Sequence, residues 1–122
     1  DMNEYKAIAS AVSKSEVYKS AFAITVFDGE GLESPTIGGA KAANQLLDIS
    51  GIKASFVITA YNDTIYISAR SIDEVNVQLV MERMGGGGHL SIAGAQIKDA
   101  NIEDVKERLK AVVEEMINNK EI

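Results

Sequence analysis

Two stripes of apolar residues at helical spacing occupy the first half of the chain. The first predicts a helix from the N-terminus to about Ser15, and the second predicts a helix that Thr36 caps and that Ser50 and Gly51 end. Small residues at 38–43 would let this second helix pack closely. The apolar positions expected to form the two stripes are Tyr5, Ile8, Ala9 and Val12, and then Ile37, Ala40, Ala43, Leu46 and Leu47.

The second half of the chain predicts two more helices. Ser71 begins the sequence Ser-Ile-Asp-Glu, which is typical of a capping box in which Ser71 and Glu74 bind free backbone amides at the start of a helix. We expect Gly85 to end that helix and Asn101 to cap the last one. Their buried positions are expected to be Ile72, Val75, Leu79 and Val80, and then Ile102, Val105, Leu109, Val112, Val113 and Met116.

Runs of apolar and β-branched residues between these helices predict strands. Asn62 and Asp63 tolerate positive φ, so the strands on either side of them are expected to pair as a hairpin. Leu90–Ala95 is short and is expected to form one helical turn. The strands are expected at Tyr18–Phe27, Ala54–Ala60, Thr64–Arg70 and Ala95–Lys98. The whole pattern indicates an α/β fold with a mixed β-sheet of about four to five strands flanked by helices.

Length and composition indicate a soluble domain. The chain has 122 residues, 46% of them apolar, and a chain of this size can fill one core, so we expect a single domain over 1–122. The absence of cysteine excludes disulfides and thiolate metal sites. No apolar run reaches the about 18 residues of a membrane span, so we expect a cytoplasmic domain without membrane contact. Because the sequence begins with Asp1, we expect it to be a fragment of a longer protein, and the resemblance described below implies the C-terminal part.

The net charge limits the kind of anionic partner. With 12 basic and 18 acidic residues the chain carries a formal charge of −6. Long nucleic acids draw most of their affinity from many lysine and arginine contacts, which an acidic domain supplies poorly. A small anion in one local pocket remains compatible with this charge.

The most informative stretch is Gly85, Gly86, Gly87, Gly88 and His89, in which glycines precede the only histidine. Glycines let a ligand approach the backbone closely, so we predict that N–H groups here bind a phosphorylated ligand. The carboxyl end of the preceding helix repels anions, and we expect the attraction to come from the loop amides, a short helix near His89 and cationic side chains. The stretch matches neither a Walker loop nor a dinucleotide-binding fingerprint.

Two side chains could assist the glycines. His89 could donate to a phosphate, stack on a base or act as a general acid, and the alternative is a histidine that only caps neighbouring backbone. Arg70 could grip a phosphate with two hydrogen bonds, and the alternative is a surface ion pair with Asp73 or Glu74. A lone histidine without cysteine gives no metal-binding motif.

The joined stretch 68–97, SARSIDEVNVQLVMERMGGGGHLSIAGAQI, resembles the carboxy-terminal DHHA1 domain of DHH-family phosphodiesterases. Within that family it is most similar to the GdpP-type cyclic-di-AMP phosphodiesterases. The likeness covers nearly the whole chain, including 54–58 and 98–109.

The resemblance implies a substrate-binding module of a manganese-dependent enzyme that hydrolyses cyclic-di-AMP to linear pApA. In this family a preceding DHH domain holds two manganese ions, so the resemblance implies no catalytic residue, metal ligand or cofactor in this chain, and no activity of the fragment alone. The longer protein would be anchored to the cell membrane. The substrate-binding residues that the resemblance implies are Arg70, Ser71, Gly86, Gly87, Gly88 and His89.

The expected partners are therefore a cyclic dinucleotide or a short oligonucleotide, and the DHH domain of the same chain. An alternative is an RNA or single-stranded oligonucleotide-binding module, since DHHA1-like domains also resemble parts of nanoRNases and alanyl-tRNA synthetases. A third possibility is that the domain mainly forms a homodimer.

Overall fold

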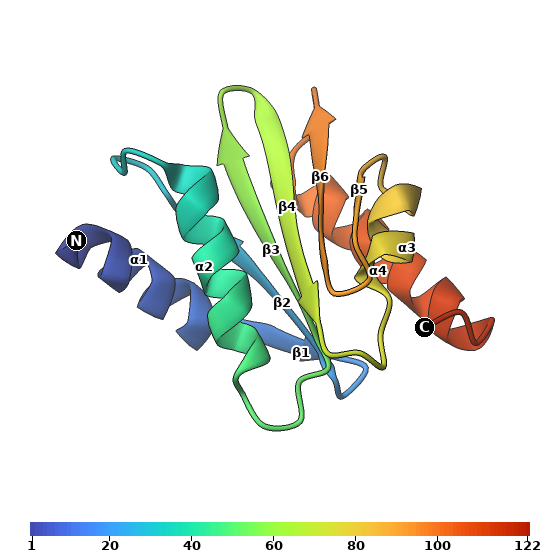
Figure 1. Ribbon diagram of the computed structural model, residues 1–122. Helices are drawn as coiled ribbons and strands as arrows, with labels where there is room; N and C mark the ends of the chain where they lie inside the picture. The colour runs from blue at the N-terminus through green and yellow to red at the C-terminus, as the bar shows by residue number, and fades with distance from the viewer.

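The computed structural model describes all 122 residues and consists of one mixed sheet between two pairs of helices (Figure 1). The sheet has six strands in the order β1-β2-β3-β4-β6-β5. The elements are α1 (Met2–Ser13), β1 (Glu16–Tyr18), β2 (Phe22–Phe27), α2 (Pro35–Leu47), β3 (Ala54–Tyr61), β4 (Thr64–Ser71), α3 (Val77–Arg83), β5 (Gly87–Gly88), β6 (Ile92–Lys98) and α4 (Ile102–Asn118).

The mixed α/β class is confirmed, but the sheet has more strands than the sequence predicted. The expected strand at 18–27 is two antiparallel strands, β1 and β2, because Lys19 and Ser20 have φ values of 52° and 68° and turn the chain between them. Only β2 and β3 are parallel, and the other neighbours are antiparallel. The β3–β4 hairpin has the expected turn, with Asn62 and Asp63 at φ 51° and 61°.

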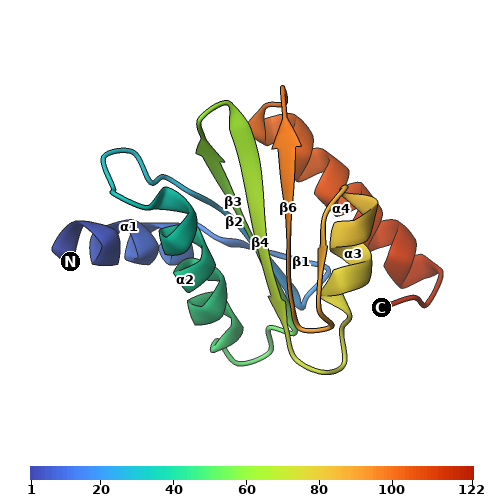
Figure 2. The same ribbon diagram turned by 45° about the horizontal axis from the view of Figure 1, so that its top comes forward.

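The helices cover opposite faces of the sheet (Figures 1 and 2). The larger core lies under α3 and α4, where Phe56, Met81 and Leu109 are fully buried. A smaller core under α1 and α2 contains Phe27 and Leu46. Because strand side chains alternate between faces, β2 and β3 contribute to both cores, whereas β4 and β6 contribute only to the larger one.

Helix α2 buries the expected residues Ala43 and Leu46, but its N-terminal part differs from the prediction. It begins at Pro35 after Ser34, not after Thr36, because proline fits the first helical position. Ile37 is 53% exposed, and the buried residues are Pro35, Gly38, Gly39, Ala42, Ala43 and Leu46. A Cβ on Gly38 would lie 2.5 Å from the Phe27 ring, so the missing side chain permits the close packing that the sequence suggested.

Helix α1 buries part of the expected stripe. Ile8 and Val12 pack on the smaller core as predicted, whereas Tyr5 is 67% exposed and Ala9 is exposed. Ala7 and Ala11 contact the core in place of these two residues.

The capping box at Ser71 is wrong. Ser71 is the last residue of β4, and α3 begins only at Val77, where the Asn76 side chain accepts a hydrogen bond from the Leu79 amide. Glu74 forms an ion pair with Lys53 and caps no helix. Of the positions expected to be buried, Val75 and Val80 are buried, but Ile72 and Leu79 are each 37% exposed.

The helical turn expected at Leu90–Ala95 is also wrong. The chain turns at 89–91 and then forms β6, which begins at Ile92, earlier than the expected strand. The last helix is confirmed, with the Asn101 side chain accepting from the Asp104 amide and Val105, Leu109, Val113 and Met116 buried.

Candidate functional site

The sheet presents one uncovered face where β4, β6 and β5 lie side by side. Helix α2 packs on β2, β3 and β4, while α3 and α4 lie against the opposite face of the sheet (Figure 2). The register places Ser68, Gly94 and Gly87 directly opposite one another, so they form one row across the three strands. We call this surface the open face; it is formed by Tyr66, Ser68, Arg70, Ile92, Gly94, Gln96 and Gly87.

The row of small residues is a trough between two taller rows. Arg70 and Ile92 pair on one side of it, and Tyr66 and Gln96 pair on the other. A groove of about 440 Å³ lies on the Tyr66–Gln96 side of this row and is lined by Thr36, Tyr66, Ile67, Ser68, Gly85, Gly86, Gly94, Ala95 and Gln96. With two glycines in its floor, the trough lets a flat or anionic group approach the backbone closely.

Arg70 is held at the edge of this trough by uncharged acceptors. Its Nε donates to Asn44 Oδ1 at 2.9 Å, and its Nη1 donates to the Ala69 carbonyl at 2.9 Å. Partial burial lowers the pKa of Arg70, and no carboxylate forms an ion pair with it. The alternative of a surface pair with Asp73 or Glu74 is therefore wrong, and the charge of Arg70 remains available.

The four consecutive glycines do not form the expected cradle of free amides. Gly85, at φ +87°, donates to the Glu82 carbonyl, and the Gly86 amide donates to the Met81 carbonyl at 2.8 Å, which together end α3 in a Schellman motif. A Cβ on Gly86 would lie 2.0 Å from the Gly94 oxygen. The amides of Gly85 and Gly86 therefore stabilise the fold and are not free to bind a phosphate.

Gly87 and Gly88 differ from each other. Gly88 has φ +142°, and a Cβ there would lie 2.5 Å from the Ala93 Cα. Gly87 has neither a positive φ nor any atom within 4 Å of an added Cβ. The fold itself thus requires glycine at 88 but not at 87, where the missing side chain leaves the open face bare.

His89 lies at the turn between β5 and β6, not at the start of a helix. Its amide donates to the Ile92 carbonyl at 2.7 Å, and Ile92 in turn pairs with Arg70, so the three residues follow one another across the sheet. The histidine is exposed and its imidazole makes no hydrogen bond. The alternative that the imidazole caps neighbouring backbone is not what the structure shows.

Ser71 stabilises the turn between β5 and β6. It is buried, and its hydroxyl donates to the Val75 carbonyl at 2.6 Å, with the Leu90 carbonyl 3.3 Å away as a second acceptor. The Ser71 amide also donates to the Ser91 carbonyl. Of the six residues implied by the resemblance, the structure thus brings Arg70, Gly87 and His89 to the open face or its edge, whereas Ser71 and Gly88 shape the backbone around it. Gly86 does both, since it ends α3 and lines the groove.

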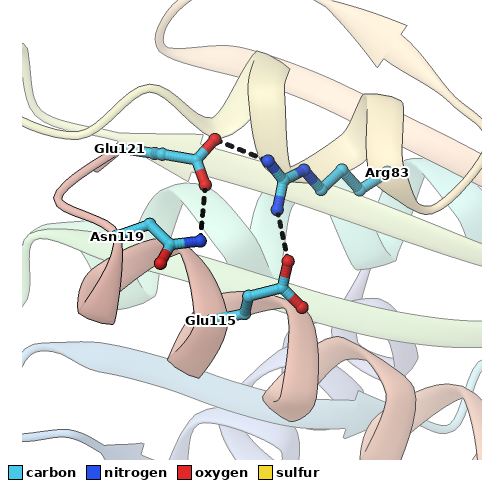
Figure 3. Close-up of polar contacts among 4 residues, drawn as sticks. All are labelled: Arg83, Glu115, Asn119 and Glu121. Atoms are coloured by element: carbon cyan, nitrogen blue, oxygen red, sulfur yellow. Dashed lines mark hydrogen bonds and ion pairs between the residues drawn. The ribbon is translucent and has the colours of Figure 1, made fainter.

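Sequence reasoning missed several residues that form or support this site. Gly94 could be noticed only through its register with Gly87, and Asn44 only through its contact with Arg70. A further group fixes the end of α3 just before the glycines: Arg83 binds Glu115 at 3.2 Å and Glu121 at 2.5 Å, and Asn119 also binds Glu121 (Figure 3). These pairings link residues far apart in the chain, which local patterns do not reveal.

The side chains of this chain do not fit a metal centre. No group of three or more His, Cys, Asp and Glu residues lies close enough together to hold an ion. None of the helices has the length and apolar character required to cross a membrane.

The DHHA1 domain family matches residues 22–119 of the chain. The chain belongs to the DHHA1 family. This match confirms the family that the sequence resembles, and it includes every residue of the open face.

The curated relatives of this DHHA1 chain include cyclic-di-AMP phosphodiesterases. It is 38% identical over 115 residues to the cyclic-di-AMP phosphodiesterase PdeA of Listeria monocytogenes, covering 93% of this chain and 17% of that protein. It is 48% identical over 75 residues to the cyclic-di-AMP phosphodiesterase GdpP of Geobacillus thermodenitrificans, covering 61% of this chain and 11% of that protein. The chain therefore spans less than a fifth of either relative.

A solved structure shows the same fold in another protein. The chain matches an exopolyphosphatase-related protein from Bacteroides fragilis with a TM-score of 0.82 and 19% identity, covering 95% of this chain and 35% of that one. At this identity the likeness concerns the fold alone.

Proposed function

We propose that this DHHA1 chain is the nucleotide-binding part of a phosphodiesterase that hydrolyses cyclic-di-AMP to linear pApA. It binds the cyclic dinucleotide, or its linear product, on the open face. The metal ions that activate water belong to a manganese-dependent DHH domain outside these 122 residues, so the chain alone is inactive. The observation that carries this proposal is the bare Ser68–Gly94–Gly87 row next to Arg70 in a chain so similar to PdeA and GdpP.

The charges on the open face suit a small anion. Arg70 lies beside the trough without a carboxylate partner, and a charged hydrogen bond from it to a phosphate is worth about 1.5–3 kcal/mol. Across the sheet from Arg70, beyond Ile92, His89 offers an exposed imidazole. Phosphate contacts at this edge would leave the bases of the dinucleotide to pack on the trough.

In this proposal the chain binds the substrate and a separate DHH domain carries out the hydrolysis, so the chain needs no nucleophile of its own. Substrate-positioning groups accelerate a reaction by fixing the reacting bond against the catalytic groups. Arg70 and the glycine trough would fix the phosphodiester in this way. The DHH domain supplies the chemistry of the metal-activated water.

Binding can be tested on the 122-residue chain by NMR titration with cyclic-di-AMP and with pApA. We expect the amide signals of Gly87, Gly94 and Ser68 and the Arg70 Nε–H signal to shift, including for an affinity as weak as about 1 mM, or about −4 kcal/mol. Arg70→Gln should weaken binding at least about tenfold, because it removes one charged hydrogen bond. His89→Ala should weaken binding without lowering the melting temperature, because the exposed imidazole forms no side-chain hydrogen bond in the fold.

Arg108→Gln is the matched control. Arg108 is exposed on α4, on the opposite side of the sheet, and its only bond is to the Arg83 carbonyl. The proposal fails if neither dinucleotide shifts the open-face signals, or if Arg70→Gln and Arg108→Gln bind equally well. Joining the chain to a DHH domain and measuring kcat/KM for cyclic-di-AMP hydrolysis then tests the enzymatic role of Arg70 and His89.

A further inference from the structure

We propose that Asn44 of α2 is a positioning residue that holds the Arg70 guanidinium toward the open face. This inference rests on the proposed function. Its structural basis is the 2.9 Å hydrogen bond from Arg70 Nε to Asn44 Oδ1, which joins a helix residue to a strand residue 26 positions away. Asn44 does not itself touch the trough; it acts through Arg70.

Helix α2 is fixed above the sheet next to this contact. The buried Ser55 hydroxyl of β3 donates to the Ala43 carbonyl of α2 at 2.7 Å. Ser55 of β3 lies opposite Arg70 of β4 in the sheet. These two neighbours bind Ala43 and Asn44, which are consecutive residues of α2. This pair of contacts sets the helix position and places the Asn44 oxygen over Arg70.

The contact with Asn44 leaves most N–H groups on Nη1 and Nη2 of Arg70 free to bind a ligand. Arginine has five N–H donors. Asn44 takes the one on Nε and the Ala69 carbonyl takes one on Nη1, so three remain on Nη1 and Nη2. A freely rotating arginine would lose side-chain entropy on binding a ligand, and an arginine that is already held loses less.

Only the acceptor oxygen of Asn44 takes part in this contact. An aspartate at 44 would offer an oxygen at the same place but would add a negative charge beside Arg70, whereas an alanine would offer no acceptor. Asn44 is exposed on a helix, and alanine favours helix more than asparagine does, so Asn44→Ala should not lower the melting temperature. Loss of affinity without loss of stability therefore separates positioning from a structural role.

The experiment compares the wild-type chain with Asn44→Ala, Asn44→Asp and the control Gln45→Ala. Gln45 is the next residue of α2, is also exposed and forms no side-chain hydrogen bond. Two quantities are measured by NMR: solvent exchange of the Arg70 Nε–H without ligand, and affinity for pApA. We expect Asn44→Ala to speed the exchange and weaken binding about three- to tenfold. Gln45→Ala should keep slow exchange and bind within about twofold of wild type. Asn44→Asp should also keep slow exchange but bind pApA more weakly, because its carboxylate would pair with Arg70 and repel the phosphates.

Three other results would contradict the proposal, each at a different step. Equal Nε–H exchange in wild type and Asn44→Ala would show that Asn44 does not hold Arg70. Faster exchange with unchanged pApA affinity, or a weakening that Gln45→Ala shares fully, would overturn the positioning role alone. If the wild-type chain binds neither pApA nor cyclic-di-AMP, the proposed function fails and the role of Asn44 in binding fails with it.

Discussion

The glycines of the run 85–88 are equivalent in the sequence but not in the structure. Gly85 provides the left-handed residue that ends α3, while Gly86 and Gly88 let β5 lie against the backbone of β6. Gly87 alone has neither requirement. At the scale of single residues, the distinction between folding and binding can therefore be tested within one short segment.

Gly87→Val should preserve the fold and impair binding. The valine would project onto the open face without meeting any neighbour, and valine favours strand conformation, so stability should change by less than about 1 kcal/mol. Affinity for pApA should fall at least about tenfold, because the side chain fills the trough. Thermal unfolding and the NMR titration measure the two effects.

Gly86→Ala is the companion variant with the opposite expectation. Its Cβ would meet the Gly94 carbonyl and the Ala95 backbone, so we expect a loss of about 1–3 kcal/mol in unfolding free energy. A Gly87→Val chain that unfolds early, or that binds pApA as well as wild type does, would refute the assignment of Gly87 to the open face.

At the scale of elements, the edge strand β1 is attached to α4 by charge. Glu16 contacts Lys106 and Lys110 of α4, each at 3.0 Å. Hydrogen bonds from Lys110 and then from Lys106 hold the pKa of Glu16 below its usual value. The charged carboxylate is thus favoured in the folded chain, which links stability to pH.

This linkage predicts a pH-dependent effect of Glu16→Gln. A carboxylate with a lowered folded pKa stabilises the fold above its unfolded pKa of 4.5, and the stabilisation is lost as pH falls through the folded value. Wild type should therefore be more stable than Glu16→Gln at pH 7, and the two should converge below about pH 4. The difference should be small and should shrink in high salt, because the pair is partly exposed.

Denaturant unfolding from pH 7 to pH 3 measures this convergence. Glu30→Gln, in the loop before α2 and without an ion pair, should run parallel to wild type over the same range. A constant difference between wild type and Glu16→Gln at all pH values would contradict the assigned cause.

At the scale of the whole molecule, the sequence predicted what neighbouring residues determine. The hairpin at Asn62 and Asp63 and the cap at Asn101 depend on residues within a few positions, and both are confirmed. Ser71 carries an equally clear local capping pattern, but its hydroxyl binds Leu90 and Val75 instead, because β6 and its turn lie beside it only in the folded chain. The candidate site was predicted in part for the same reason: the glycine run and Arg70 stand out locally, whereas the open face exists only through the register of β4, β6 and β5.

The charge of the whole molecule distinguishes a dinucleotide site from an RNA-binding surface. Six of the 12 basic residues form ion pairs with carboxylates, namely Lys19, Lys41, Lys53, Arg83, Lys106 and Lys110. Arg70 is the basic residue of the open face. A longer strand leaving the trough would therefore extend over a molecule with a net charge of −6 and would gain little attraction from it.

We accordingly predict that affinity stops increasing at the length of a dinucleotide. Oligoadenylates of two and six nucleotides should bind alike, and the slope of log affinity against log salt should be about −1 for both, because few phosphates are neutralised. Titrations at several salt concentrations measure this, with Arg70→Gln expected to flatten the slope and Arg108→Gln to leave it unchanged. A slope that steepens with each added nucleotide would instead favour the oligonucleotide-binding alternative, since the counterions released would then scale with the length of strand bound.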